Sequence, residues 1–83
     1  MAPEYYEHVR MRDIYQKDLL ALKAAMETVN IQRRVLSNVV ALRSVYPAMA
    51  ALDTAIVRMG SAATELQREI DRHTQGITEA VAA

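Results

Sequence analysis

Residues 49–80 read MAALDTAIVRMGSAATELQREIDRHTQGITEA, and a core-type residue returns there at alternating steps of three and four. Such steps keep a set of side chains on one face of an α-helix that packs against another helix. The repeat holds for ten positions, with a histidine as its one polar member: Met49, Leu52, Ile56, Met59, Ala63, Leu66, Ile70, His73, Ile77 and Ala80. We therefore predict a long helix over about residues 47–75 that packs along its whole length.

Two glycines bear on the continuity of this helix. Gly60 and Ser61 could end one helix and cap another. Because the repeat passes through them in register, we predict a continuous helix in which Gly60 costs about 1 kcal/mol relative to Ala. Gly76 begins a stretch that has only small or short residues after Ile77, so we expect the tail over residues 76–83 to fray.

The first half of the chain predicts a second helix over about residues 3–45. Pro3 suits a first helical turn, and the acidic Glu4 and Glu7 suit the helix dipole. An apolar face, interrupted by one arginine, follows the same spacing and then widens into two parallel rows: Tyr15, Leu19, Leu22, Met26, Val29, Arg33, then Val35, Val39, Leu42, Tyr46 beside Leu36, Val40. A face this broad usually meets two neighbours.

Pro47 separates the two helices. It has no N–H to donate and disfavours helical angles at Tyr46, so the chain should break near this residue. The matched lengths of the two segments favour an all-α antiparallel hairpin that is coiled-coil-like and turns near residue 46, with Tyr46 covering the corner. The alternative is a single kinked rod, because the corner lacks the glycine that helix hairpins commonly use.

Length and composition favour a single unit, residues 1–83, that needs help from partners. The chain is 52% apolar and 24% charged, with zero formal net charge, two glycines, two prolines and no cysteine. A chain of 83 residues buries too little of its own surface to be generously stable alone. We therefore predict that other protein subunits, in a homo- or hetero-oligomer, complete the bundle through an interface of Leu19, Leu22, Met26, Val29, Arg33, Leu36, Val40, Leu52, Ile56, Met59, Leu66 and Ile70.

Charge also favours pairing of the two halves. Residues 1–46 carry seven basic and five acidic side chains, and the remainder carries three basic and five acidic ones. With a turn near residue 46, the acidic stretch over residues 65–71 lies near Lys23, whereas Arg33 and Arg34 have no obvious mate within the chain. These two arginines are then either solvated or paired with an acidic neighbour in a complex.

Each histidine follows a carboxylate by four residues, Glu4 before His8 and Glu69 before His73, so each pair shares a helical face. With the turn near residue 46, the two pairs lie well apart. The Glu-x-x-His motif of helical-bundle metal sites is absent, so no metal site is predicted. His73 could set the register or respond to pH, but we expect a partly exposed residue near the end of the helix.

Several other functions lack support in the sequence. No nucleophile–histidine–acid set, phosphate-binding glycine loop or basic stripe with interleaved aromatics is present. We therefore expect no catalytic residues, no cofactor, no small-molecule ligand and no nucleic acid. The apolar runs are too short for a transmembrane segment, and no signal peptide or presequence is recognised at the acidic start. The expected location is soluble and intracellular (cytoplasmic) or within a large assembly.

Three functional hypotheses remain. The leading one is a non-enzymatic structural subunit that contributes helices to a coiled coil or helical bundle. The first alternative is a small helical chaperone or regulator that binds a client helix. The second is a minimal homodimeric enzyme that uses Arg12, Arg33 or Arg43 to clamp an anion.

Overall fold

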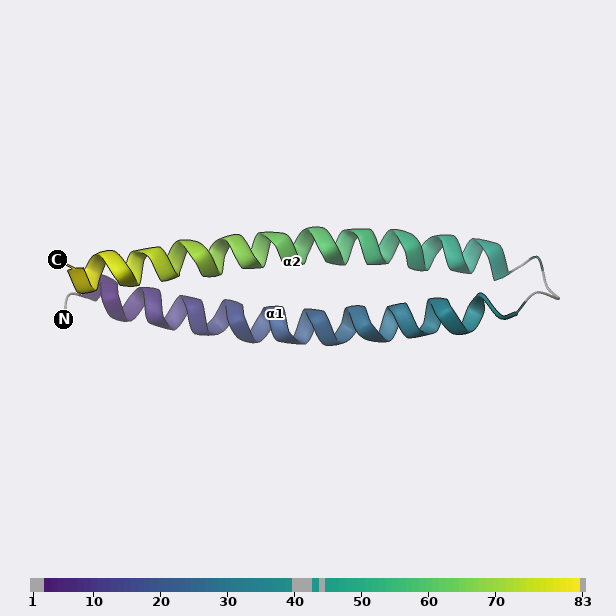
Figure 1. The fold of residues 1–83 in the computed structure, drawn as a ribbon, viewed down its shortest axis with the longest axis horizontal. Coiled ribbons are helices and arrows are strands. Elements are labelled where there is room, and N and C mark those ends of the chain that lie inside the picture. The colour runs from purple at the N-terminus through teal and green to yellow at the C-terminus, as the bar shows by residue number, and fades with distance from the viewer. Residues whose placement is uncertain (1–2, 40–42, 44, 83) are drawn as a thin grey trace.

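The protein is a helical hairpin in the computed structural model, which describes residues 3–39, 43 and 45–82. Helix α1 spans Pro3–Leu36 and helix α2 spans Val45–Ala82. The two lie side by side and antiparallel, so both termini are at one end and the turn is at the other (Figure 1). The molecule measures 64 × 15 × 14 Å. The predicted hairpin is confirmed, and the kinked rod is not formed.

Helix α1 begins at Pro3 as predicted but ends at Leu36, nine residues before the expected boundary at 45. Polar side chains explain the earlier end, because the Ser37 hydroxyl and the Asn38 amide both donate to the carbonyl of Arg34, at 2.6 and 3.4 Å. The backbone N–H of Asn38 also shifts to an i→i+3 bond with the carbonyl of Val35. Such local bonds compete with the helical ladder. The expected helical positions Val40 and Leu42 lie outside the described residues.

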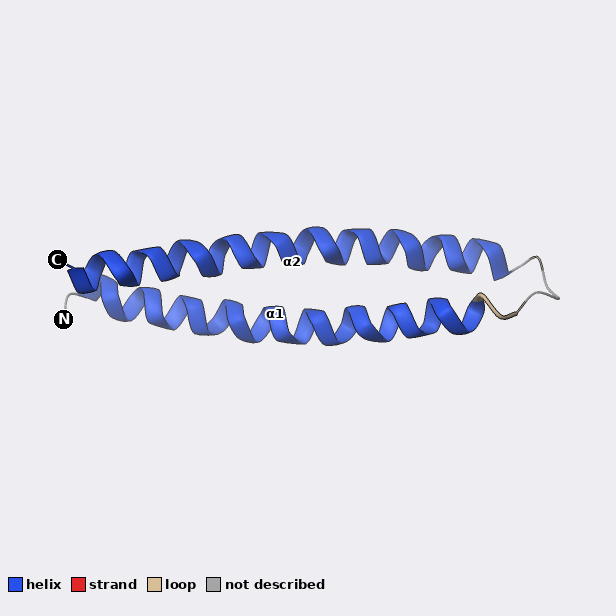
Figure 2. Ribbon diagram, viewed as in Figure 1, coloured by secondary structure: helices blue, strands red, loops and turns tan. Residues whose placement is uncertain are grey.

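Helix α2 begins at Val45, two residues before Pro47. Pro47 thus lies in the first turn, where a missing N–H leaves no helical bond unmade. Tyr46 is 63% exposed, so the expectation that it covers the corner is wrong. The helix passes through Gly60 without a break, as predicted, and all described residues outside the two helices lie at the turn (Figure 2).

Helix α2 continues to Ala82, past the predicted end at residue 75 and through residues 76–82 of the stretch that was expected to fray. Ile77 and Ala80 are both partly buried, which extends the apolar face to the end of the helix. Gly76 is partly buried as well and lies against the ring of His8. Packing against α1 thus outweighs the poor helix propensity of this stretch.

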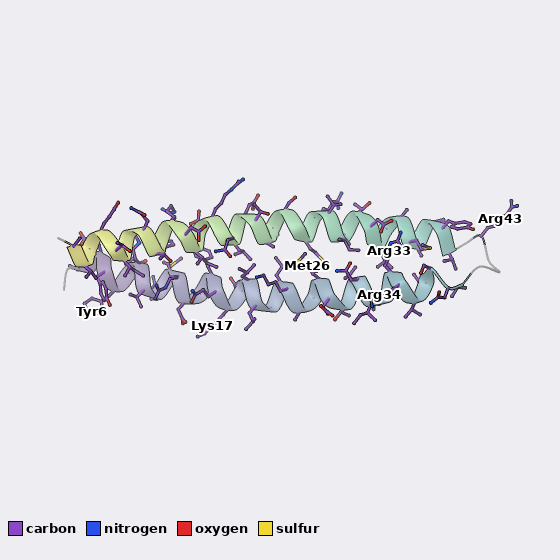
Figure 3. The ribbon with its side chains drawn as sticks, viewed as in Figure 1. Tyr6, Lys17, Met26, Arg33, Arg34 and Arg43 are labelled. Atoms are coloured by element: carbon purple, nitrogen blue, oxygen red, sulfur yellow. The ribbon has the colours of Figure 1, made fainter. Side chains whose placement is uncertain are left out.

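The core of the hairpin is one layer of side chains between two helices. All ten positions of the repeat in residues 49–80 are buried or partly buried. Within α1, the predicted face is buried or partly buried as well, except at Val35, which is exposed. Met26 lies between the helices, whereas Lys17 points away from α2 (Figure 3). In the described part of the chain, the only buried apolar side chains belong to Leu19 and Ile70, at 7% and 6% exposure.

The register differs from the expected one. Arg33 and Asp53 face each other across the gap between the helices, so the hairpin is centred near residue 43 rather than 46. Moving the centre by three residues moves the partner of each α1 residue by about six, close to one heptad of the opposite helix. The shifted register accompanies the early end of α1 at Leu36. This shift changes which polar groups meet.

Candidate functional site

The predicted partner interface lies on the facing sides of the two helices. Eleven of its twelve residues are described, and Val40 lies outside the described residues. Leu19 and Ile70 are buried, and the other nine are partly buried: Leu22, Met26, Val29, Arg33, Leu36, Leu52, Ile56, Met59 and Leu66. The pairing of α1 with α2 therefore covers part of this surface and leaves part of it open. That a second protein covers the rest stays a prediction.

An open apolar groove of about 520 Å³ runs beside the turn end of the hairpin. Helix α1 contributes Ile31, Gln32, Val35 and Leu36 to its lining, and helix α2 contributes Ala48, Ala51 and Leu52. Ile31 and Val35 are 47% and 60% exposed. The wide apolar sector expected from the sequence is thus partly open to solvent here. The small alanines of α2 form one wall, and the branched side chains of α1 form the other.

Arg33 has a partner within the chain, contrary to the expectation from the sequence. Its Nε donates to Oδ1 of Asp53 at 2.6 Å, and its Nη2 lies 3.4 Å from Oδ2. The hydrogen bond and the charge of Asp53 both raise the pKa of Arg33. Arg34 is exposed on the neighbouring position. The missed pairing follows from the register, because a turn near residue 46 would carry Asp53 past Arg33.

The arginines considered as anion clamps do not converge. Arg33 is engaged by Asp53, whereas Arg43 lies in the turn and points away from the helices at the end of the molecule (Figure 3). A clamp needs two or more cationic groups aimed at one point. The described geometry gives no support to that hypothesis.

The opposite end of the hairpin holds a polar cluster that was missed from the sequence. Nδ1 of His8 lies 2.8 Å from Nδ1 of His73, and their ring centroids are 5.1 Å apart. The ring of Tyr15 stacks on that of His73 at 5.7 Å with an interplanar angle of 22°. The expectation that the two histidine pairs lie well apart is therefore wrong. A predicted centre near residue 41 would have placed residues 8 and 73 opposite each other, whereas the predicted centre near residue 46 did not.

His73 is buried, with 6% exposure, rather than partly exposed as expected. Its Nε2 lies 3.4 Å from Nη2 of Arg72 and 3.8 Å from Oε2 of Glu69. Burial lowers the pKa of His73, and the charges of Arg72 and His8 lower it further, against the opposing charges of Glu69 and Glu7. The neutral ring is thus the favoured form in the folded hairpin.

The histidine cluster offers few ligands to a metal. Across residues 3–39, 43 and 45–82, no group of three His, Cys, Asp or Glu side chains is placed to hold a metal ion. The two Nδ1 atoms are also already engaged with each other. The contact is best described as a hydrogen bond between imidazoles.

Neither described helix combines the length and the apolar character that a bilayer crossing requires. Comparison of the chain with protein-family models, with curated proteins and with solved structures finds no match.

Proposed function

We propose that this protein is a non-enzymatic subunit of a larger assembly, to which it contributes two helices of a bundle. The surface that it leaves uncovered supports this proposal. The hairpin exposes 6085 Å² of surface, whereas a compact folded monomer of 9.3 kDa exposes about 5,000 Å². The excess of about 1,100 Å² is of the size that one partner contributes to a specific interface, about 800 Å².

The apolar groove between Ile31, Val35 and Ala51 is the proposed centre of contact. Its open apolar walls accept an amphipathic helix that lies along the hairpin and adds a second layer to the core. Alanines on one wall let the incoming backbone approach closely. Burial of the two exposed branched side chains supplies the driving force, at about 25 cal/mol for each Å² of apolar surface.

Size-exclusion chromatography with light scattering at micromolar concentration, together with circular dichroism, tests the proposal. We expect either an oligomer or a poorly cooperative monomer that becomes ordered in its native complex. A stable, fully helical monomer with a cooperative melt would contradict it.

A matched pair of variants locates the contact. Val35→Glu places a charge in the groove, so it should abolish the oligomer or the recovery of the native complex. Val57→Glu makes the same change at a site that is 68% exposed and outside the groove lining, so it should leave the assembly intact. Equal effects from both substitutions would contradict the placement of the contact in the groove.

The same groove supports a second candidate, a chaperone or regulator that holds one helix of a client. In that case the oligomer is absent, and the purified chain gains helicity and a sharper melt only when the client helix is added. Titration with the client peptide under circular dichroism distinguishes this function from that of a permanent subunit, whose partner copurifies with it.

A further inference from the structure

The contact between His8 and His73 joins the free ends of the two helices. His8 lies in the second turn of α1, and His73 lies nine residues before the end of α2. Both termini are at this end of the molecule (Figure 1). Beyond His73, helix α2 has Gly76, Ile77 and Ala80 partly buried, so His73 with its hydrogen bond and the stacked ring of Tyr15 forms the last layer among the described residues that contains a buried side chain.

The surroundings of His73 indicate which nitrogen carries the proton. Arg72 has only hydrogens to offer, so Nε2 of His73 serves as the acceptor at 3.4 Å. The neutral His73 ring then carries its proton on Nδ1 and donates it to Nδ1 of His8 at 2.8 Å. This arrangement holds while both rings are neutral, with Nε2 of His73 accepting from Arg72 and Nδ1 of His8 accepting from Nδ1 of His73.

We propose that His8 and His73 form a pH-sensitive clasp, which holds the ends of α1 and α2 together at neutral pH and releases them when acid charges both rings. A first proton leaves one Nδ1 lone pair free to accept, so the hydrogen bond survives. A second proton places N–H groups on both Nδ1 atoms and leaves no acceptor between them. Two cationic rings then face each other with their centroids 5.1 Å apart.

The nearby carboxylates do not compensate fully for this charge. The charged groups that act on His73 are Glu7 from α1 and Glu69 and Arg72 from α2. Glu7 is already held by Nη2 of Arg10 at 2.9 and 3.1 Å. Glu69 is held by Nη2 of Arg72 at 2.7 Å, and the same guanidinium approaches His73. Glu7 and Glu69 are therefore each already paired with an arginine, whereas Glu4, four residues before His8, is a further carboxylate beside that ring.

The clasp goes beyond the proposed function, because its action is intramolecular and its position is at the far end from the groove. The groove at the turn end would be unaffected, so the two proposals fail independently.

Distances between spin labels test the clasp in the full chain. The sequence has no cysteine, so nitroxides attach only where cysteines are introduced. One pair, Tyr6→Cys with Val81→Cys, reports on the ends, where both native side chains are exposed. A control pair, Val35→Cys with Ala51→Cys, reports on the turn end. Dilution with unlabelled chain removes distances between molecules.

We expect both pairs to give one narrow distance at about pH 7.5, and only the end pair to lengthen and broaden at about pH 5.5, above the range in which carboxyl groups titrate. An end pair that is unchanged at the lower pH would overturn the proposal. Equal broadening of both pairs would overturn it too, because that outcome is global unfolding.

A variant that keeps only one histidine of the pair distinguishes a pH-sensitive clasp from a contact that only stabilises the hairpin. His8→Asn keeps a donor and an acceptor near the Nδ1 position and cannot be charged, so the difference between the two pH values should disappear. The readout is this difference, which remains measurable even if the variant is less stable. His73→Asn provides the same test from the other helix. A pH response that persists in both variants would overturn the proposal.

Discussion

At the end that holds both termini, His8, Tyr15 and His73 stack between the helices, whereas at the turn end Ile31 and Val35 lie on the open side of a groove. The described buried side chains, Leu19, Ile70 and His73, all belong to the half nearer the termini. Large rings and branched side chains fill the space there. The turn half of α2 carries alanines instead. The two helices therefore bury their side chains more completely at the end that holds the termini, here called the sealed end, than at the turn end.

Shortening a buried side chain in the half nearer the termini should have the largest effect on stability. Leu19→Ala removes one of the two buried apolar side chains, and we expect a loss of about 2–3 kcal/mol in the free energy of unfolding. Urea denaturation followed by circular dichroism measures the loss. Leu20→Ala, at a neighbour that is 73% exposed, is the control and should change stability little. Similar losses from both would mean that Leu19 contributes no more to stability than its exposed neighbour, and would contradict the close packing of this half.

The free energy of unfolding should fall in mild acid because of His73, which lies at the end of the molecule that holds both termini. Because burial lowers the pKa of His73, the unfolded chain binds its proton first as the pH drops. Stability is therefore complete above about pH 6.5 and declines below it, with the unfolding constant rising up to about tenfold per pH unit for each extra proton bound. Thermal melts at about pH 7.5 and 5.5 measure this. Melts that coincide would show that the histidines contribute nothing to the difference between the ends.

The two glycines of α2 provide a matched comparison. Gly60→Ala meets no atom within 4 Å and should stabilise the hairpin by about 1 kcal/mol through helix propensity. A Cβ on Gly76 would lie about 2.5 Å from Nε2 of His8 and would push that ring aside. Gly76→Ala should therefore gain less than Gly60→Ala, and it should weaken the pH dependence. Chemical denaturation at two pH values measures both effects, and equal gains would contradict the close packing at residue 76.

The smallest effect is expected at the open end. Arg33→Gln removes a pair whose side chains are 40% and 51% exposed, so solvent and salt screen much of the attraction. We expect the melting temperature to fall by no more than about 2 °C, and the fall to vanish at high salt. A double-mutant cycle with Asp53→Asn measures the coupling, with Arg34→Gln as the control. A coupling that persists in high salt would mean that the turn end is better sealed than the exposure of this pair suggests.

The early end of α1 explains why the sequence predicted the helices better than their contacts. Pro47 marked a break, and the break was assigned to it. The stop is made instead by Ser37 and Asn38, whose side chains turn back to the carbonyl of Arg34. The expected continuation through Val40 and Leu42 lies outside the described residues.

The histidine contact was missed for the same reason. Each histidine was recognised with its own carboxylate at i−4, a relation within one helix. A contact between residues 65 positions apart depends on the register, which a few residues at the turn can shift by a heptad. The polar His73 on an otherwise apolar face was the available signal, because a buried polar group needs a partner from the opposite helix.

Heptad spacing, composition and two prolines were enough to predict two long helices and most of the face that each one buries, because periodicity is a local property that each helix carries alone. The sequence favoured a hairpin but left a kinked rod open, and the structure decided for the hairpin. The alignment of those faces was determined only in three dimensions. Since the side-chain layer between two helices can slide by a heptad and still bury apolar groups, the side-chain hydrogen bonds at Ser37 and Asn38, the pairing of Arg33 with Asp53 and the contact of His8 with His73 together select the register.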